Sequence, residues 1–494
     1  MLLRTRRGFL RQAACAAVGS IAISNTLRDF RFINAALAQG SDPFANYKAL
    51  VCVFLSGGND CNNFIIPRGA DYNNYFGARQ NLAIPEASLQ NITSINDDGH
   101  LYGFHPNCGE LATLFSEQKL AILFNVGPLL FPTTRDQYQK RSVALPPQLF
   151  SHSDQVTHWQ TSLPDKPADT GWGGRAAREL FLDMTTSQRD AMQISLCTSI
   201  AGANTLETAN TFGISLPVGE NATNVNKLKQ YHVSTSGAVL LGGVATNRKA
   251  TMLNIARLNQ TNLQERAYGD LMDRAIVLGD TLTTAIAPTV DTGTNPPWHW
   301  TVPFPNTTLG NQLKMIARLV AARGALGMKR QIFFASVGGY DTHTSQVGTT
   351  PLVGSHANLM NELSEAIFAF QRGIEQVAVN ATYGHPTLAS SVTGFTASDF
   401  GRTFPTNGQG SDHGWGSHHI VFGGGVKGKR TYGAFPALVV NGPNDTSTGR
   451  WIPSTSVDEY SATLASWFGV TNTDLPTVFP NLGRFANSNL GFML

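Results

Sequence analysis

Residues 49–60, with the sequence ALVCVFLSGGND, decide the class of the fold. Seven consecutive apolar residues, 49–55, run directly into a serine and two glycines, and Asn59 and Asp60 follow. A strand that is apolar on both faces is typical of a parallel sheet covered by helices on each side. Glycines allow a sharp turn, so the segment predicts a buried strand that delivers the carboxylate of Asp60 at its carboxyl end.

The same pattern recurs along the chain, with helical periodicity between the apolar runs. This alternation predicts an α/β fold of three layers, in which a doubly wound, mostly parallel sheet lies between helices. The further apolar runs are residues 120–124, 331–335, 391–397 and 419–422, and the helical segments are residues 107–117, 309–325 and 355–379.

Three of the predicted strands end in carboxylates. Asp60 follows the first strand, Asp341 and His343 follow the third, and Asp399 follows the fourth. Ligands bind at the carboxyl ends of the strands in such sheets. Because three converging carboxylates repel one another, we expect a metal ion or shared protons there. A single aspartate after a strand is more often a helix cap or turn residue, so the expectation depends on the three together.

The segment 410–419 supplies further ligand types. It contains Asp412, His413, His418 and His419 between glycines. Imidazole nitrogens with aspartate oxygens suit Zn²⁺ or Mn²⁺ better than Ca²⁺, so one or two such divalent ions are expected. His418 and His419 begin a strand and point to opposite faces, so at most one of them is expected to reach the site. The alternative is a surface loop rich in histidine and glycine.

Ser151 is a candidate nucleophile because it stands at a predicted helix start, followed by His152. Free backbone N–H groups and the helix dipole favour an anion there, and a nearby metal could activate the hydroxyl. The alternative is an ordinary N-cap serine with His152 on the surface, which composition alone favours. No G-x-S-x-G elbow lies near Ser151, so a classical serine hydrolase is not indicated.

Residues 1–38 have the three parts of an export signal: a charged start, an apolar run over 13–23, and Ala-Leu-Ala at 36–38. Paired Arg6 and Arg7 indicate the twin-arginine translocation machinery, which carries folded proteins. We therefore expect a periplasmic or extracellular protein. The apolar run of eleven residues is too short to span ~30 Å of hydrocarbon, so no stable membrane anchor is expected.

The charge balance argues against a nucleic-acid partner. The whole chain has a formal net charge of +3, but six arginines and one aspartate fall within residues 1–38. The remainder has 30 basic and 32 acidic residues, a net charge of −2. Without a basic field, binding to nucleic acid is not expected.

Four cysteines follow the signal without a CxxC pair, so no zinc-finger or redox motif is indicated. Cys52 is expected to be a plain core residue. A disulfide among the other three is left open.

Residues 200–305 lack the buried-strand pattern, and residues 250–286 form one long amphipathic helical stretch. We interpret this block as a largely helical insertion in a single domain over residues 39–494. It is either a lid over the substrate pocket or an elaboration away from the site. The expected inner face consists of Leu253, Ala256, Leu263, Leu271 and Ala275.

An ordered set of motifs resembles the twin-arginine-exported family known as domain of unknown function 1501. The resemblance runs from the signal to about residue 440. It implies an alkaline phosphatase-like fold, because that family is placed in the alkaline phosphatase and sulfatase superfamily; its activity is not settled. The motifs are VFLSGGND (53–60), NVG (125–127), LFSHSDQ (149–155), GWGGR (171–175), GGYDTH (338–343), SDFGR (398–402) and SDHG (411–414).

The resemblance implies site residues in the order of the superfamily. Asp60 matches the first metal-binding aspartate, and Ser151 matches the nucleophile. Asp341 and His343 match an Asp/His pair, at a shorter spacing than in alkaline phosphatases. Asp399 matches the aspartate that follows.

His413 is the best match to the final histidine of the superfamily. Phe400 stands where another histidine would be, so a second metal site is expected to be weaker, or completed by Asp412, His152 or Asn59. No Cys/Ser-x-Pro-x-Arg signature is present, so a formylglycine sulfatase is not expected.

Two functions are therefore considered. The first is an exported metal-dependent hydrolase of a small phosphate, sulfate or related ester, in which Ser151 or a metal-bound water attacks. Arg402 would clamp the anionic oxygens, or be a structural partner of Asp399. The second is a non-catalytic binding protein that keeps the metal-site geometry to recognise a ligand or surface polymer. The expected metal ligands are Asp60, Asp341, His343, Asp399, Asp412 and His413.

Overall fold

The structure is a computed structural model that describes residues 44–96, 98–237, 246–293 and 298–494. The chain divides into two compact units, Met1–Asn46 and Tyr47–Leu494. The predicted export signal, residues 1–38, lies outside the described residues. The second unit contains the central sheet and the candidate site.

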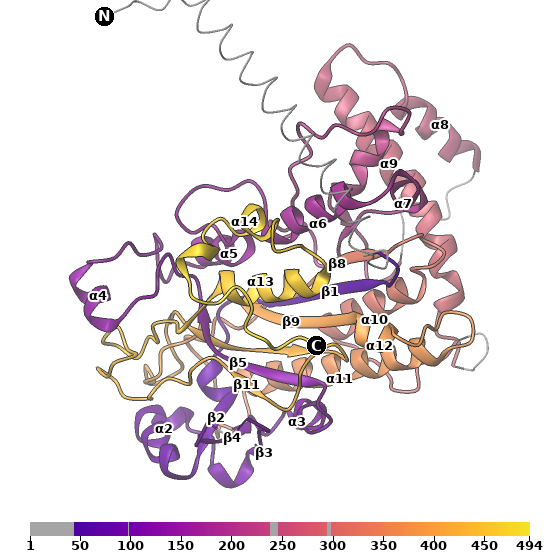
Figure 1. Cartoon of the computed structure of the whole chain (residues 1–494). Helices are drawn as coiled ribbons and strands as arrows, with labels where there is room; N and C mark the ends of the chain where they lie inside the picture. Colours follow the sequence, from indigo (N-terminus) through magenta and orange to yellow (C-terminus); the bar gives the residue numbers. More distant parts are fainter. Residues whose placement is uncertain (1–43, 97, 238–245, 294–297) are drawn as a thin grey trace, which may run out of the picture. The chain divides into compact units, whose positions relative to one another are not determined.

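A mixed sheet of nine strands forms the centre of the second unit (Figure 1). Its strands are β1 (Lys48–Leu55), β5 (Leu120–Gly127), β6 (Cys197–Ser199), β7 (Tyr231–His232), β8 (Arg330–Val337), β9 (Val392–Ser398), β10 (Ser417–Phe422), β11 (Thr431–Tyr432) and β12 (Thr455–Ser456). They lie in the order β11-β5-β10-β9-β1-β8-β6-β7, and β12 pairs with β5.

The predicted first strand lies in the middle of this sheet. β1 pairs in parallel with β8 on one side and with β9 on the other. Its residues from Ala49 to Leu55 are all buried. The predicted mostly parallel α/β sheet is thus confirmed, because a strand apolar on both faces is stable only where helices cover both faces.

β10 departs from the parallel arrangement. It runs antiparallel to both β5 and β9. The loop of residues 399–416 leads from β9 to β10 without a crossover helix, and a parallel return would need one. As a result, the amino end of β10 and the loop before it lie at the carboxyl edge of the parallel strands.

Helices cover the two faces of the sheet (Figure 1). On one face, Trp172 and Tyr460 pack against Phe395 of β9, with ring centroids 5.7 and 6.1 Å away. On the other face, Phe370 packs against Phe422 of β10 at 6.3 Å. The first layer contains α5 (His152–Thr161), α6 (Trp172–Asp183) and α13 (Val457–Phe468), and the second contains α3 (Gly109–Ser116), α10 (Thr308–Ala321) and α11 (Ser355–Val379).

Smaller elements complete the second unit. An antiparallel sheet has the order β2-β4-β3, with β2 (Ile65–Arg68), β3 (Gln90–Ile92) and β4 (Leu101–Phe104). The short α-helices are α2 (Tyr72–Arg79), α4 (Arg135–Lys140), α7 (Thr186–Ala191), α12 (Leu388–Ser391) and α14 (Leu475–Val478). The 3₁₀ turns are η1 (Cys61–Asn63), η2 (Gly69–Asp71), η3 (Gln80–Leu82), η4 (Glu86–Ser88), η5 (Ala222–Leu228), η6 (Ala287–Thr289) and η7 (Leu482–Arg484).

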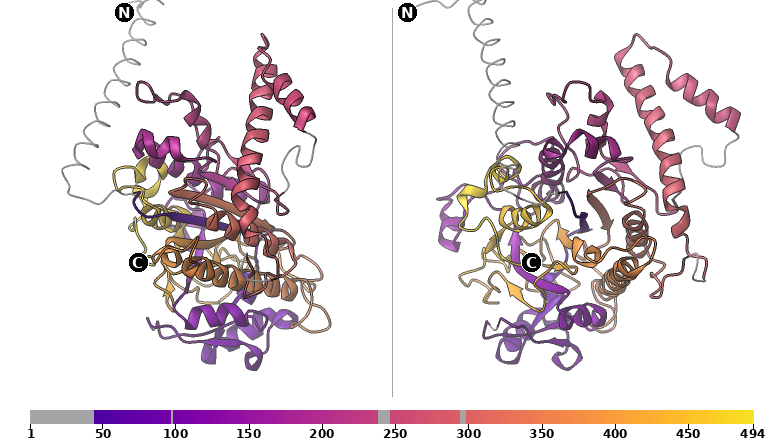
Figure 2. Two further views of the ribbon diagram at one scale, coloured as in Figure 1. Left: turned by 90° about the vertical axis from the view of Figure 1, so that its right-hand side faces the viewer. Right: turned by 45° about the vertical axis from the view of Figure 1, so that its right-hand side comes forward.

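The predicted helical stretch 250–286 is two helices, α8 (Thr246–Ala256) and α9 (Leu263–Ile286), which lie side by side (Figure 2). Its expected inner face is wrong in part, because Leu263 and Leu271 are 76 % and 58 % exposed. α9 turns a different face inward, because Gly269 lets it approach the backbone of Ala256 closely. The buried residues of α9 are Gly269, Ile276, Gly279, Leu282 and Ile286.

The four cysteines of the described residues, Cys52, Cys61, Cys108 and Cys197, are buried and free. They therefore form no disulfide with one another, and Cys52 is confirmed as a core residue. Within the described ranges, no helix combines the length and apolar character needed to cross a membrane.

Candidate functional site

The candidate site lies where the turns after β1, β8 and β9 meet the start of α5. An open cavity of about 450 Å³ is found there. That volume is within the range of small-molecule sites. The lining residues are Ser56, Gly57, His152, Ser153, Val156, Gly338, Gly339, Asp341 and Asp399.

Gly57 allows these turns to come together. Its φ is +116°, and a Cβ on it would lie 2.4 Å from the backbone nitrogen of Asp341. Its N–H donates to Asp399 Oδ1 at 3.0 Å, and its carbonyl accepts a hydrogen bond from Arg402 at 3.2 Å. Only glycine adopts this conformation without strain and leaves room for the neighbouring turn.

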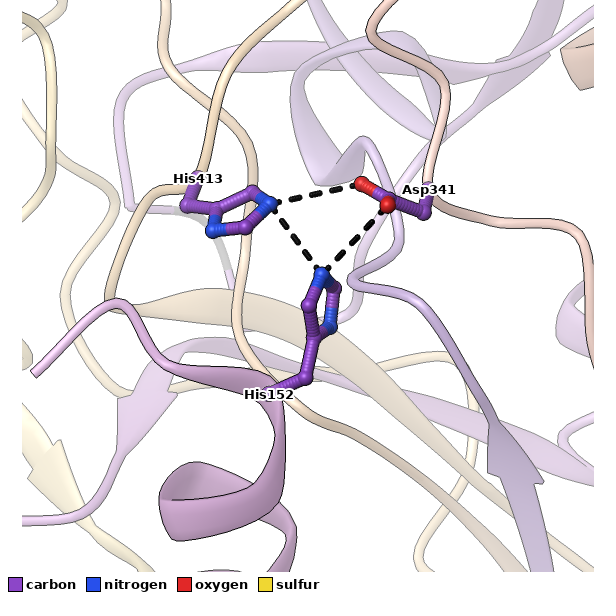
Figure 3. A group of neighbouring side chains, drawn as sticks. All are labelled: His152, Asp341 and His413. Atoms are coloured by element: carbon purple, nitrogen blue, oxygen red, sulfur yellow. Dashed lines mark hydrogen bonds and ion pairs between the residues drawn. The ribbon is translucent and has the colours of Figure 1, made fainter.

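Three side chains meet at one edge of the cavity: His152, Asp341 and His413 (Figure 3). The Nε2 atoms of His152 and His413 are 3.1 Å apart. Asp341 Oδ2 lies 3.5 Å from the first of them, and Asp341 Oδ1 lies 3.4 Å from the second. Donor atoms around one tetrahedral Zn²⁺ lie about 3.3 Å from one another, so these three side chains have the spacing of three of the four ligands of a zinc ion.

His343 forms a second triangle on the same Asp341–His413 edge. Its Nε2 atom is 2.8 Å from Nε2 of His413 and 3.2 Å from Asp341 Oδ1. The Asp341–His413 edge is therefore shared by two triangles, one completed by His152 and the other by His343. Imidazole nitrogens with a carboxylate are donors that suit Zn²⁺ or Mn²⁺.

An acceptor outside the cluster holds the second nitrogen of each of the three histidines. His152 Nδ1 is 2.7 Å from Asp399 Oδ2, and His343 Nδ1 is 2.9 Å from Asp412 Oδ1. His413 Nδ1 is 2.7 Å from the carbonyl oxygen of Phe150. Carboxylates and carbonyls only accept, so Nδ1 donates in each ring and a neutral ring turns its Nε2 lone pair toward the cluster. A cation between His152, Asp341 and His413 would satisfy the lone pairs of the two histidines in that group.

The charges of the cluster also suit a cation. Burial raises the pKa of Asp341, but the hydrogen bond and the positive charge of Arg402 outweigh it and keep that pKa below its ordinary value. Burial lowers the pKa of His413, and the charge of Arg402 lowers it further. Near neutral pH the site thus offers an ionised carboxylate and a neutral imidazole, the forms that bind metals.

Arg402 holds Asp341 from behind. Its Nη1 donates to Asp341 Oδ1 at 2.7 Å, and its Nη2 donates to the carbonyl of Ser411. Its side chain is fully buried and does not line the cavity. The structure therefore pairs Arg402 with Asp341, whereas the partnership with Asp399 considered from the sequence is not seen among the described contacts.

Asp399 and Asp412 lie one layer outside the converging donors. Asp399 is only 2 % exposed and holds His152. Asp412 holds His343 and accepts a hydrogen bond from Asn407 at 3.0 Å. Burial raises the pKa of Asp412, but the bonds from Asn407 and His343 outweigh it, so that pKa is lowered. Both aspartates, expected to be metal ligands, instead orient the histidines.

Asp60 is not brought into the converging group. Its side chain is fully buried, and its Oδ2 accepts hydrogen bonds from Arg79 and Gln346. Burial raises the pKa of Asp60, but the charge of Arg79 outweighs it and lowers that pKa. From the sequence, a metal ion was expected to balance the charge of Asp60. In the structure, the guanidinium of Arg79 balances it.

Ser151 and the remaining candidates lie close to the site without joining the cluster. Ser151 is the N-cap residue of α5, makes no capping hydrogen bond, and donates its hydroxyl to Asp154 Oδ2 at 2.6 Å. The hydroxyl-bearing residues that line the cavity are Ser56 and Ser153. Phe400, at the position of the missing histidine, packs its ring 4.8 Å from His152 and 4.7 Å from His413.

His418 and His419 point to opposite faces of the sheet, as predicted. His418 packs against Phe124, and His419 packs against Trp159. Burial lowers the pKa of each to about 3. Both are core residues of β10.

His152 is the residue that sequence reasoning undervalued. From the sequence alone it is only an alternative ligand, because the neighbouring Ser151 matches the nucleophile position of the family resemblance. Its position as the first residue of α5 sets it beside His413, since the carbonyl of the nearby Phe150 holds the His413 ring.

Residues 47–448 match the family described as "Protein of unknown function (DUF1501)". No curated protein matches the chain. The match covers most of the second unit and includes every residue of the candidate site, so the chain belongs to the DUF1501 family.

Proposed function

We propose that this protein is an exported, metal-dependent hydrolase of phosphate, sulfate or related esters, with an alkaline phosphatase-like fold. The mostly parallel sheet and the order of site residues along the chain support the fold assignment. The paired arginines at residues 6 and 7 support twin-arginine export to the periplasm or beyond.

One observation carries the proposal: the Nε2 atoms of His152 and His413 and the carboxylate oxygens of Asp341 lie 3.1–3.5 Å from one another. The Nε2 atom of His343 lies on the other side of the Asp341–His413 edge, 2.8 Å from that of His413. Each ring is fixed through its other nitrogen. A set of lone pairs held this close is electrostatically unfavourable without a cation and favourable with one. A divalent ion, Zn²⁺ or Mn²⁺, is the cofactor that this donor set suits best.

The chain's own residues have separate tasks in this proposal. His152, His413 and Asp341 hold the ion, and His343 is the candidate for a further ligand on the Asp341–His413 edge. Arg402 fixes the orientation of Asp341. The bound ion would supply Lewis acidity toward an ester oxygen and lower the pKa of a neighbouring water or hydroxyl. In the reaction, a water oxygen bonds to phosphorus or sulfur, the bond to the leaving oxygen breaks, and a proton from the water passes to the leaving oxygen.

The attacking group is tested by serine variants. Ser151 is the nucleophile expected from the family resemblance, and Ser153 lines the cavity. If one of them attacks, its alanine variant keeps its metal and loses turnover. If water attacks directly, both variants keep most of the activity.

The function itself is tested with metal-free protein reconstituted with Zn²⁺, Mn²⁺ or Mg²⁺ and a panel of 4-nitrophenyl esters. We expect metal-dependent hydrolysis in the parent and none in His413→Ala. His299→Ala is the matched control, because His299 also pairs with an aspartate, Asp291 at 3.0 Å, but outside the site. Metal binding without turnover of any ester would instead support the non-catalytic binding protein, whose ligand would be a surface polymer or small anion.

Residues 200–305 are either a lid over the substrate pocket or an elaboration away from the site. None of the residues that line the cavity comes from the described part of this segment. A lid over the substrate stays a prediction, and deletion of α8 with retained activity would support the elaboration away from the site.

A further inference from the structure

The cavity beside the converging histidines has no cationic lining. Of its nine described lining residues, none is lysine or arginine, and two are aspartates, Asp341 and Asp399. Arg402, the nearest guanidinium in contact with the site, is fully buried behind Asp341. A substrate in the cavity therefore meets no positively charged side chain of the described chain directly.

The charged side chains in contact with the site determine its net charge. Asp341, Asp399 and Asp412 carry three negative charges, and Arg402 carries one positive charge. One divalent ion makes this group formally neutral. The next charges outward are of opposite sign: Arg450 donates to the carbonyl of His413, and Asp154 accepts from Ser151.

Two uncharged residues that follow β8, Gly338 and Gly339, line the cavity instead. Among the described contacts, no hydrogen bond occupies their backbone N–H groups. Gly338 faces open space, because a Cβ on it would meet no atom within 4 Å. Successive free N–H groups suit one anionic oxygen without adding net charge.

We infer that the site takes tetrahedral esters carrying a single negative charge, phosphodiesters or sulfate monoesters, in preference to dianionic phosphate monoesters. The inference rests on the proposed hydrolase function and names its substrate class. The group is formally neutral overall, so only its one exposed cationic centre attracts an anionic oxygen, and it does so locally. The second charge of a phosphate monoester, whose second pKa is about 6, gains no partner. The open cavity leaves room for the second substituent of a diester.

The first test measures kcat/KM at pH 8 for bis(4-nitrophenyl) phosphate, 4-nitrophenyl sulfate, 4-nitrophenyl phosphate and 4-nitrophenyl acetate, with the protein reconstituted with Zn²⁺. We expect one of the two monoanionic esters to be the best substrate, and which of them it is separates a phosphodiesterase from a sulfatase. Fastest hydrolysis of the phosphate monoester overturns the inference and leaves the proposed function intact, whereas fastest hydrolysis of the acetate contradicts both. No hydrolysis of any ester defeats the proposed function, and binding then decides the inference.

The second test measures binding by titration calorimetry, with phenyl sulfate and phenyl phosphate as probes of matched shape and different charge. At pH 8 we expect phenyl sulfate to bind the metal-loaded protein more tightly. Equal or tighter binding of phenyl phosphate contradicts the inference whether or not the protein is a hydrolase.

A charge added to the lining gives an internal control. Val156 lines the cavity from α5, and Val156→Lys adds one positive charge there, while Val156→Met adds similar length without charge. At a separation of about 7 Å, one charge changes the affinity for a second negative charge by roughly threefold at the dielectric constant of water and roughly fiftyfold at an effective value of about 20. We expect Val156→Lys, and not Val156→Met, to raise the binding of phenyl phosphate relative to phenyl sulfate by a factor between these limits. An unchanged ratio in both variants would mean that charge at the cavity does not set the preference.

Discussion

Replacing Asp399 by asparagine perturbs the candidate metal site without touching a donor atom of the converging group. Asp399 is 2 % exposed, lies 2.7 Å from His152 Nδ1, and accepts the N–H of Gly57 at 3.0 Å. The variant keeps the size of the side chain and removes its negative charge. The His152 ring then loses the carboxylate that raises the basicity of its Nε2 atom.

Loss of such an outer carboxylate lowers metal affinity by about 10- to 100-fold in known sites. That factor corresponds to about 1.4–2.7 kcal/mol of binding free energy. Without metal, the variant relieves repulsion among Asp341, Asp399 and Asp412, so the metal-free protein is not expected to lose comparable stability. The stabilisation by metal, measured as the shift in Tm between chelator and saturating Zn²⁺, should therefore shrink.

Competition with a chromogenic chelator measures the Zn²⁺ affinity directly. Asp291→Asn is the matched control, because Asp291 pairs with the exposed His299. We expect the control to leave the affinity unchanged. A Kd for Asp399→Asn within twofold of the parent would refute the role of Asp399 in orienting a metal-binding histidine.

The remaining predictions concern backbone geometry, pH and export. Gly57→Ala forces a side chain into a φ of +116° beside Asp341. The free energy of unfolding, measured with a chemical denaturant, should fall by about 1–3 kcal/mol. Gly483→Ala is the control, because a Cβ there meets open space, and its stability should not change. Burial raises the pKa of Glu207 to about 8, so the folded state favours the protonated carboxyl. Stability therefore falls as the pH rises from about 4.3, the unfolded value, toward 8. Glu207→Gln should flatten that part of the stability–pH profile, and an unchanged profile would contradict the raised pKa of Glu207. Substituting lysine for both Arg6 and Arg7 should leave the protein in the cytoplasm in a fractionation assay, while processed parent protein should begin near Gln39; export of the lysine variant would argue against the twin-arginine route.

The main strands could be predicted from the sequence because strands buried on both faces are continuous apolar runs. A run such as residues 49–55 is apolar at every position, and the structure buries all of it in β1. The helix of residues 355–379 is also found at the predicted bounds. The direction of β10 could not be predicted, because an apolar strand looks the same in either orientation and the connecting loop decides it.

The proximity of candidate residues could be predicted where a residue's position on the sheet edge determines its neighbours. Asp341, His343 and His413 do converge. Asp60 was expected there on the same reasoning, but the pairing with Arg79 depends on a residue 19 positions away whose approach no local pattern reveals. The buried face of α9 could not be predicted for a similar reason. Gly269 allows close contact with Ala256 of α8, so the buried side of α9 differs from the one that a regular apolar stripe predicts.

The central claim, that His152, His413 and Asp341 hold a divalent ion, is tested most directly by metal analysis of the folded protein. Purified mature protein is stripped with chelator, incubated with Zn²⁺ or Mn²⁺, desalted, and analysed by mass spectrometry of its metal content, with His413→Ala and His299→Ala treated alike. The account predicts about one ion per chain in the parent and in His299→Ala, and a loss of that ion in a folded His413→Ala protein. A parent that retains no metal and gains no thermal stability from any divalent ion would contradict it.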